Sequence, residues 1–217
     1  MTDGIAVLGG TGPEGLGIAA RLAAAGEEVI VGSRQRSRAT EAAALLAREV
    51  PAARLRGAAN ADAAAAAGLV FVAVPLAGVD TILDECAASF GGKIVVEVVN
   101  ALRPVNGQLR AIETPDGLVA RRIAARAPSA RLVSGFKHAS AANLRAVERR
   151  LEGDVLLCGD DEAAKRTVAD LVRRMPDLRP IDAGGLAVAP LLDHLTALLL
   201  GLNRRHHTET SIRIVGL

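Results

Sequence analysis

The stretch Ile5-Ala6-Val7-Leu8-Gly9-Gly10-Thr11-Gly12-Pro13-Glu14-Gly15 decides the fold of this chain. Its first half, Ile5 to Gly9, is a short apolar run, which is typical of a strand buried on both faces of a parallel sheet. From Glu14 to Ala25 apolar and small residues recur at helical spacing, and Gly26 stands where a helix C-cap is expected. A buried strand therefore leads through a glycine-rich turn directly into a helix.

Strands and helices continue to alternate through the first hundred residues. The expected strands are 28–31, 54–57, 69–74 and 93–99, and the expected helices between them are 37–49, 61–67 and 79–88. A crossover helix is needed to return the chain to a parallel neighbour, so this alternation predicts an α/β fold with a doubly wound parallel sheet of the Rossmann type.

The second half of the chain follows a different pattern. Residues 100–115 resemble a loop, and a helix then leads to the strand 131–134. After the strand 154–158 and the helix 161–174, residues 186–205 form one long helix that is apolar on nearly every face. Such a helix is buried in a core or in an oligomer interface, and we expect an interface. We place the boundary between the Rossmann domain (1–150) and a small C-terminal domain (151–217) near residue 150.

The glycine loop Gly10–Gly15 matches the pattern G-x-G-x-x-G in the context that this pattern requires, between a strand and a helix. One glycine makes the tight turn, one lets the backbone approach a pyrophosphate, and one lets helix and strand pack closely. The free N–H groups of the helix N-terminus then bind the anion. A glycine-rich turn without a ligand is the alternative interpretation. We expect a dinucleotide, held here by Gly10, Thr11, Gly12, Pro13 and Glu14.

The residues at the end of the second strand indicate whether the dinucleotide is NAD or NADP. An NAD site places an acid there to bind the ribose hydroxyls. Residues Gly32–Arg38 contain no acid, but they contain Ser33, Arg34 and Arg38. Because a guanidinium group can donate two hydrogen bonds to phosphate oxygens, these side chains favour the 2′-phosphate of NADP(H).

Composition narrows the class of protein further. Half of the 217 residues are hydrophobic, so a substantial core is expected, and the only aromatic residues are three Phe. We therefore expect no binding of nucleic-acid bases by stacking on aromatic rings. The 26 basic residues are scattered along the chain, so we expect no nucleic-acid partner. We interpret Cys86 and Cys158 as buried, inert thiols. We interpret His206 and His207 as side chains in solvent or in an interface, so we expect no metal site.

Nothing in the sequence predicts export or a membrane anchor. Residues 1–4 lack the basic region of a signal peptide, and the longest apolar run, Leu195 to Leu202, is too short to span a bilayer. We expect a soluble, cytoplasmic protein.

Several motifs together resemble those of the NADPH:F420 oxidoreductases. They are Leu8–Gly15, Val31–Arg34, Ala73–Pro75, Cys158–Asp161, Asp182–Gly184 and the ending from Leu195 through Arg205. The resemblance covers nearly the whole chain, and it implies a homodimer with a small C-terminal domain. It also implies hydride transfer between NADP(H) and F420, the deazaflavin coenzyme, as co-substrate.

The resemblance also suggests which residues contact each ligand. It implies that the adenosine phosphates are held by Thr11, Gly12, Ser33, Arg34 and Arg38, that Pro75 and Asn100 flank the nicotinamide, and that Ala141 lies near its amide. Thr196 and His194 would approach the deazaflavin, together with Ile214 of the same or the partner subunit. Hydride moves directly between stacked rings, so orientation and exclusion of water matter most and no acid or base is obligatory.

The segment Ser134–Ala141 departs from the resemblance, because Lys137 stands where that family usually has a histidine, with His138 beside it. Lys137 could bind the anionic tail of the deazaflavin, or it could protonate a carbonyl or imine if burial lowers its pKa. A solvated lysine at a strand end is the third interpretation. Lys137 therefore keeps open an NADPH-dependent reductase of a small carbonyl or imine. A non-catalytic NADP-sensing module also stays open, because the apolar helix 186–205 could be its surface for a partner protein.

Overall fold

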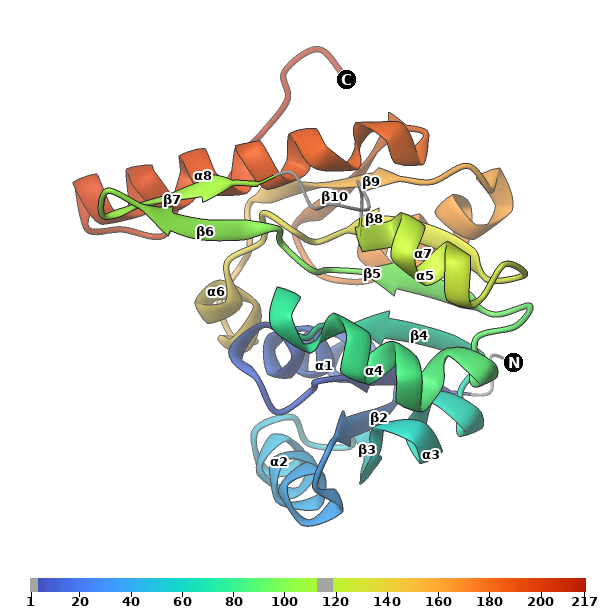
Figure 1. The fold of residues 1–217 in the computed structure, drawn as a ribbon. Helices are drawn as coiled ribbons and strands as arrows, with labels where there is room; N and C mark the ends of the chain where they lie inside the picture. Colours follow the sequence, from blue (N-terminus) through green and yellow to red (C-terminus); the bar gives the residue numbers. More distant parts are fainter. Residues whose placement is uncertain (1–3, 113–118) are drawn as a thin grey trace.

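A computed structural model describes residues 4–112 and 119–217 of the chain and shows a mostly parallel eight-stranded sheet with helices on both faces (Figure 1). The strand order is β10-β9-β8-β5-β4-β1-β2-β3. The strands are β1 (Ile5–Leu8), β2 (Glu28–Ser33), β3 (Arg54–Ala59), β4 (Leu69–Val72), β5 (Ile94–Glu97), β8 (Arg131–Gly135), β9 (Gly153–Cys158) and β10 (Leu178–Gly184). Our expectations for residues 1–3 and for the loop around Pro115 lie outside the described residues.

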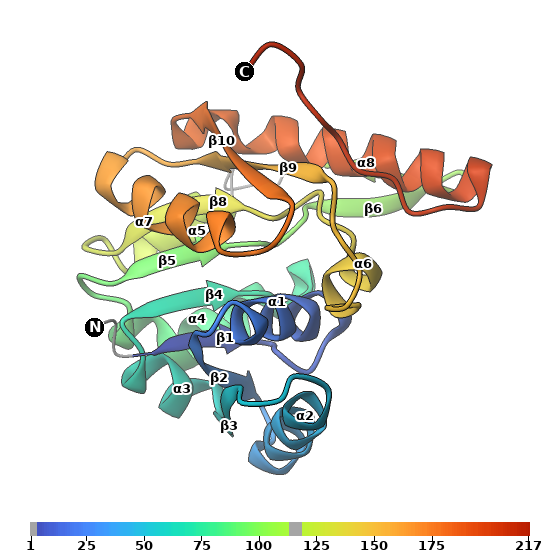
Figure 2. The same cartoon turned by 180° about the vertical axis from the view of Figure 1, so that it is seen from behind.

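The helices form two layers because strand side chains alternate between the faces. Ile5 and Val7 of β1 belong to one apolar cluster, and Ala6 and Leu8 belong to the other. The first cluster is covered by α1 (Pro13–Ala24), α2 (Arg36–Glu49), α6 (Ala141–Arg145) and α7 (Glu162–Arg173). The second is covered by α3 (Asn60–Ala66), α4 (Val79–Cys86) and α5 (Val119–Arg126). These three helices lie behind the sheet in Figure 2, where the helices of the first cluster face the viewer. The predicted α/β Rossmann architecture is therefore confirmed.

The sequence had led us to expect a parallel sheet, but two of its strands run in the opposite direction to the others. Strand β9 pairs antiparallel with β8, and β10 then pairs parallel with β9. The chain leaves β8 at Gly135, forms the short helix α6 beside α1, and enters β9 from the same edge of the sheet. A connection that stays at one edge reverses the strand direction, whereas a crossover helix would have kept it.

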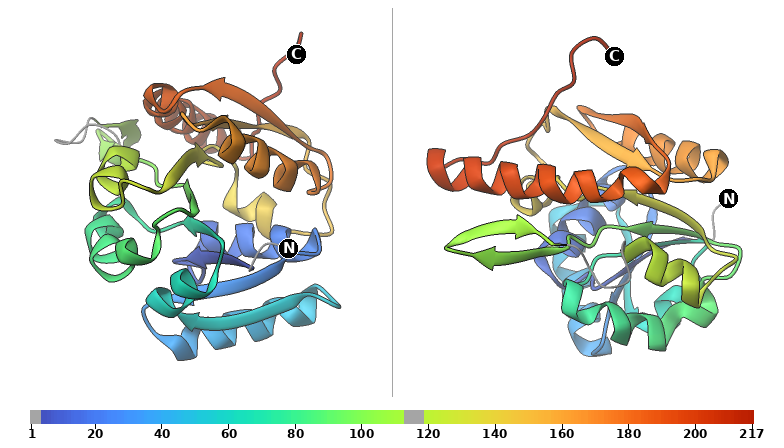
Figure 3. Two further views of the ribbon diagram at one scale, coloured as in Figure 1. Left: turned by 90° about the vertical axis from the view of Figure 1, so that its right-hand side faces the viewer. Right: turned by 45° about the horizontal axis from the view of Figure 1, so that its top comes forward.

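Residues 102–111 form a hairpin where we expected only a loop. Strands β6 (Leu102–Val105) and β7 (Gln108–Ala111) pair antiparallel around Asn106 and Gly107, whose φ angles are 49° and 74°. Asn-Gly is the strongest sequence signal for such a two-residue turn, and we overlooked it. The hairpin runs beside α8 (Ala189–His206) beyond the sheet (Figure 3).

Helix α8 is preceded by a single 3₁₀ turn, Leu186–Val188, and together they match the predicted long apolar helix. Among the described residues this is the one helix whose length and composition would let it cross a membrane, and 28% of its most apolar window is buried. Leu191 and Leu198 are 64% and 59% exposed. Much of its apolar surface therefore has no partner within the single chain.

Arg21 fixes the segment after β8 against α1. The residue is 2% exposed, and its guanidinium group donates hydrogen bonds of 2.5–3.2 Å to backbone oxygens at the end of α6 and just beyond it. The acceptors belong to Asn143, Leu144, Ala146, Val147 and Arg149. A helix C-terminus leaves its last carbonyl groups without partners, and here a buried cation from α1 satisfies them.

The two cysteines are free and buried, as predicted. Burial raises the pKa of Cys86 to about 12 and that of Cys158 to about 11. The thiols therefore stay protonated and inert at neutral pH.

Candidate functional site

A cavity of about 660 Å³ lies at the carboxyl edge of the sheet beside the glycine loop. We call it the phosphate-loop cavity, and it is lined by Gly9, Thr11, Gly12, Ser33, Arg34, Gln35, Arg38, Asn60, Ala73, Val74, Pro75, Ala77, Gly78, Thr81 and Ile82. It occupies the position where open α/β sheets bind nucleotides, outside the carboxyl ends of the strands.

Two positions of the loop have to be glycine because a side chain there would clash with the neighbouring backbone. Gly9 has a φ of 74°, and a Cβ atom there would lie 2.5 Å from the carbonyl oxygen of Ala73. A Cβ atom on Gly15 would lie 2.6 Å from the carbonyl oxygen of Gly9. Because Gly12 has no such close neighbour below 3.4 Å, its face is open to the cavity. The loop therefore packs closely on the helix and leaves its backbone accessible to a pyrophosphate.

The basic side chains of this cavity are available to bind an anion. Arg34 and Arg38 are exposed, and neither has an ion-pair partner among residues 4–112 and 119–217. Their neighbour Arg36 is instead paired with Asp62 at 2.6 Å. Ser33 is 7% exposed, and its hydroxyl accepts a hydrogen bond from the backbone of Gln35. This end of β2 fits the 2′-phosphate of NADP(H) and offers no carboxylate to the ribose.

A second cavity, of about 510 Å³, adjoins the first across the glycine loop. We call it the C-terminal cavity because α8 and residues 209–210 form one wall. Its lining residues are Pro13, Glu14, Leu16, Asn100, Lys137, His138, Ala139, Ser140, Ala141, Ala142, Arg145, Thr196, Leu199, Leu200, Asn203, Glu209 and Thr210. Residues 11–12 line one cavity and residues 13–14 line the other, so a ligand crossing the loop would reach both.

Three buried polar atoms of the C-terminal cavity's lining residues have no hydrogen-bond partner among the described residues. They are Oε1 of Glu14, Oδ1 of Asn100 and Nδ1 of His138. The other polar atoms of two of these side chains are engaged: Asn100 Nδ2 donates to the carbonyl oxygen of Lys137 at 2.8 Å, and His138 Nε2 lies 2.8 Å from that of Asp154. Native proteins rarely leave buried polar atoms unpaired, so these atoms point to a bound polar ligand.

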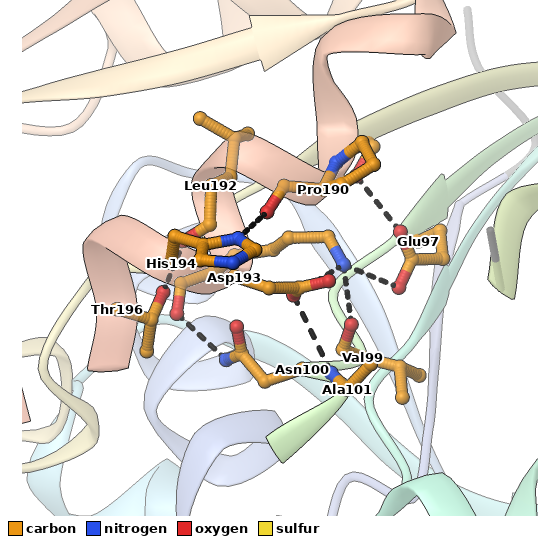
Figure 4. Close-up of polar contacts among 11 residues, drawn as sticks. Glu97, Val99, Asn100, Ala101, Pro190, Leu192, Asp193, His194 and Thr196 are labelled. Atoms are coloured by element: carbon orange, nitrogen blue, oxygen red, sulfur yellow. Dashed lines mark hydrogen bonds and ion pairs between the residues drawn. The ribbon is translucent and has the colours of Figure 1, made fainter. Parts of the chain in front are cut away.

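Lys137 belongs to a buried ion-pair cluster that joins the sheet to α8. Figure 4 labels its partners Glu97 and Asp193. Its Nζ atom lies 3.1 Å from Glu97 Oε1 and 3.1 Å from Asp193 Oδ1, and it also donates to the carbonyl oxygen of Val99. The hydroxyl of Ser134 donates to the other oxygen of Glu97 at 2.8 Å. We call Glu97, Lys137 and Asp193 the buried cluster; they are 1%, 3% and 7% exposed.

The buried cluster corrects two of our interpretations of Lys137. The lysine is not solvated, since it is 3% exposed. Its pKa is also not lowered: burial alone would lower it, but the carboxylates of Glu97 and Asp193 outweigh burial and raise it above the usual value. Lys137 therefore remains a charged ammonium group, which is a poor proton donor at neutral pH.

Three residues that we had assigned to the site line neither cavity. Gly10 is buried in the loop, where a Cβ atom would lie 2.7 Å from the carbonyl oxygen of Val7. His194 lies two positions before Thr196 on α8 and faces a groove toward β7, away from the C-terminal cavity. Ile214 is held by its backbone, whose N–H donates to Asp154 and whose oxygen accepts from Arg179.

Sequence reasoning missed Asn60, Glu97 and Asp193. Asn60 is 3% exposed, and its Oδ1 accepts a hydrogen bond from the N–H of Gly9 at 3.3 Å, which orders the glycine loop. The sequence feature that could have indicated Asn60 is its position as a polar residue directly after the third strand. Glu97 and Asp193 each interrupt an apolar run, and a charge in such a run implies a buried partner.

The fold and the two adjoining cavities define a dinucleotide-binding Rossmann protein with room for a second ligand against α8. A model of the family "NADP oxidoreductase coenzyme F420-dependent" matches residues 4–101. Full-length relatives of that name are 34% identical to this chain, so the chain belongs to the family of F420-dependent NADP reductases.

Individual relatives support this membership over the full length. The chain is 34% identical to the F420-dependent NADP reductase of Methanocaldococcus jannaschii, with 98% of each chain covered. It is also 34% identical to that of Methanothermobacter thermautotrophicus, with 100% of this chain and 97% of the relative covered. A crystal structure from Arthrobacter sp. FB24, described as an F420-dependent NADP reductase, superposes with a TM-score of 0.82 at 29% identity and covers 97% of this chain and 98% of that one.

Proposed function

We propose that this chain is an oxidoreductase that transfers hydride between NADP(H) and the deazaflavin coenzyme F420. The observation that carries the proposal is the junction of the two cavities at residues 11–14. The phosphate-loop cavity fits the adenosine half of NADP(H), and the C-terminal cavity offers unpartnered polar atoms to a second ring system. The family membership supports the same pair of ligands.

The chain's own residues act by binding and orienting. NADP(H), when bound, supplies the hydride from its nicotinamide ring. Thr11 and Gly12 would hold the pyrophosphate, and Ser33, Arg34 and Arg38 the 2′-phosphate. Pro75 lines the phosphate-loop cavity and would flank the nicotinamide. The unpartnered Oδ1 of Asn100, which lines the C-terminal cavity, would accept a hydrogen bond from an amide N–H.

The second ring would lie against α8 in the C-terminal cavity. Ala141 and Thr196 line this cavity, and the hydroxyl of Thr196 donates to the carbonyl oxygen of Leu192 at 2.8 Å, which leaves its oxygen as an acceptor. Lys137 and His138 lie beneath this surface, where they would position the wall of the site.

Mixing the protein with NADPH and oxidised F420 tests the proposal directly. We expect the visible absorbance of the deazaflavin to bleach as NADPH absorbance falls in equal amount. Protein that binds NADPH and leaves the deazaflavin unchanged would refute hydride transfer to F420.

Cofactor choice is tested separately by Arg34→Glu, with Arg48→Glu as the matched control. Arg48 is an exposed arginine of α2 that lines neither cavity. A charge-assisted hydrogen bond contributes about 1.5–3 kcal/mol, so we expect Arg34→Glu to weaken NADPH binding roughly ten- to hundredfold. NADH binding should change little in either variant. Equal losses for both cofactors would show that the 2′-phosphate does not lie at Arg34.

We further propose a cytoplasmic homodimer in which residues 151–217 carry the acceptor side of the site and the dimer contacts. The exposed apolar face of α8 supports this, together with a groove of about 770 Å³ between α8 and β7. A contiguous apolar surface of this kind usually marks an interface. The free thiols of Cys86 and Cys158 suit a reducing compartment.

The two alternative functions have less support. Reduction of a small carbonyl or imine was motivated by Lys137 as an acid, and its ammonium group is held by two carboxylates. A sensing module was motivated by the apolar surface of α8, which a homodimer would cover.

A further inference from the structure

Glu14 is an acid that no group among residues 4–112 and 119–217 neutralises. It is the second residue of α1 and it lines the C-terminal cavity, on the side of the glycine loop away from the phosphate-loop cavity. Its Oε1 atom is buried and has no hydrogen-bond partner among the described residues. An ionised carboxylate is costly to bury without a donor, so this position favours the protonated form.

The other ionisable groups of the cavity are engaged elsewhere. Lys137 is held by Glu97 and Asp193, and Arg145 forms an ion pair with Glu49. Glu209 accepts hydrogen bonds from Ser140 and Asn203, and His138 is neutral because burial lowers its pKa. None of these groups is paired with the carboxyl group of Glu14.

Burial raises the pKa of Glu14 to about 8, although the N-terminal end of a helix by itself favours a negative charge. A pyrophosphate on the adjacent amide groups would add negative charge nearby and raise this pKa further. Glu14 therefore keeps its proton at neutral pH, both with and without the dinucleotide.

We propose that Glu14 is the general acid that delivers the proton accompanying hydride transfer. The inference rests on the proposed function. A hydride brings a negative charge to the acceptor ring, and one proton neutralises it. Glu14 breaks its carboxyl O–H bond and gives that proton to a ring nitrogen of the acceptor, and water then returns a proton to the carboxylate. In the opposite direction the carboxylate of Glu14 accepts the proton as NADP⁺ takes the hydride.

The first test needs no turnover. Carbon-13 labelling of glutamate carboxyl groups lets each one be titrated by NMR in the protein without ligands. We expect one carboxyl resonance to titrate near pH 8, to disappear in Glu14→Gln and to persist in Glu41→Gln, where an exposed glutamate of α2 is changed. If no carboxyl resonance that disappears in Glu14→Gln titrates above about pH 7 in the wild type, the proposal is overturned.

The second test is kinetic. General acid catalysis typically contributes about 10²- to 10⁴-fold, so Glu14→Gln should lower kcat for F420 reduction at least about a hundredfold with NADPH affinity retained. Glu14→Asp should recover part of the rate, and Glu41→Gln should match the wild type. In the wild type, F420 reduction should decline at pH values above about 8, and the reverse reaction should increase there.

The two levels of the proposal fail in different ways. Wild-type protein that binds NADPH and never reduces F420 refutes the proposed function, whatever Glu14 does. Wild-type protein that reduces F420, with a fully active Glu14→Gln variant and an unchanged pH profile, refutes the role of Glu14 alone.

Discussion

Replacing Lys137 by methionine removes the only cation of the buried cluster while keeping an unbranched apolar side chain in its place. The side chains of Lys137 and Glu97 are 2% and 1% exposed, and that of Asp193 is 10% exposed. The substitution therefore leaves two nearly buried carboxylates next to each other without a cation between them. Removing one partner of a buried ion pair costs about 3–5 kcal/mol, and we expect a loss of unfolding free energy in that range.

For a chain of 217 residues, such a loss lowers Tm by roughly 2–4 °C per kcal/mol, or about 6–20 °C in total. Urea unfolding followed by far-ultraviolet circular dichroism measures the loss; intrinsic fluorescence is unsuitable because the chain has no Trp or Tyr. The loss should shrink on acidification. Burial raises the pKa of Glu97 already in the wild type, and the variant also lacks the charge of Lys137, which lowers this pKa. The folded variant therefore binds the proton more tightly than the folded wild type, and lowering the pH stabilises the variant more.

Lys165→Met is the matched control. Lys165 is also nearly buried, with a side chain 6% exposed, but its partners Asp182 and Glu162 are 54% and 63% exposed. Their charges remain hydrated when the lysine is lost, so we expect a cost of about 0–1 kcal/mol. The reasoning is refuted if Lys137→Met is within about 1 kcal/mol of the wild type, or if the two variants lose equal stability.

Two further substitutions test other parts of the structure. Burial lowers the pKa of His138, so the unfolded state binds a proton at this histidine more tightly than the folded state. The free energy of unfolding should therefore fall as the pH drops below about 6.5, the usual histidine pKa. In urea titrations His138→Gln should weaken this pH dependence, and an unchanged dependence would contradict the reasoning. Leu198→Glu on the exposed face of α8 should convert the proposed homodimer into a monomer, as measured by size-exclusion chromatography with light scattering. The control Val215→Glu, at a residue that is 94% exposed, should stay dimeric. A dimer that persists in Leu198→Glu would place the interface elsewhere.

The dinucleotide half of the molecule could be predicted because its signals are local. The run from Ile5 to Gly15 contains a strand, a turn and a helix start in contiguous residues, and the steric demands on Gly9 and Gly15 arise within the same segment. The basic end of β2 was likewise visible as a short stretch without acids. Propensity and periodicity describe such neighbourhoods well.

The acceptor half depends on contacts between distant residues. Lys137 and Asp193 are 56 positions apart, and no local pattern states that the two charges meet or that they reverse the expected shift of the lysine pKa. Strand β10 was missed because Pro180 and Asp182 interrupt its apolar pattern. The reversal at β9 follows from where the preceding segment docks on α1, which is a property of the folded chain.

The two cavities also differ in how early they can exist while the chain is being made. All residues of the phosphate-loop cavity lie between Gly9 and Ile82, whereas the C-terminal cavity draws on residues from Pro13 to Thr210. A growing chain on the ribosome therefore carries every side chain of the former long before the wall of the latter has been translated. A prematurely terminated product would retain the nucleotide-facing residues and lack the surface against α8.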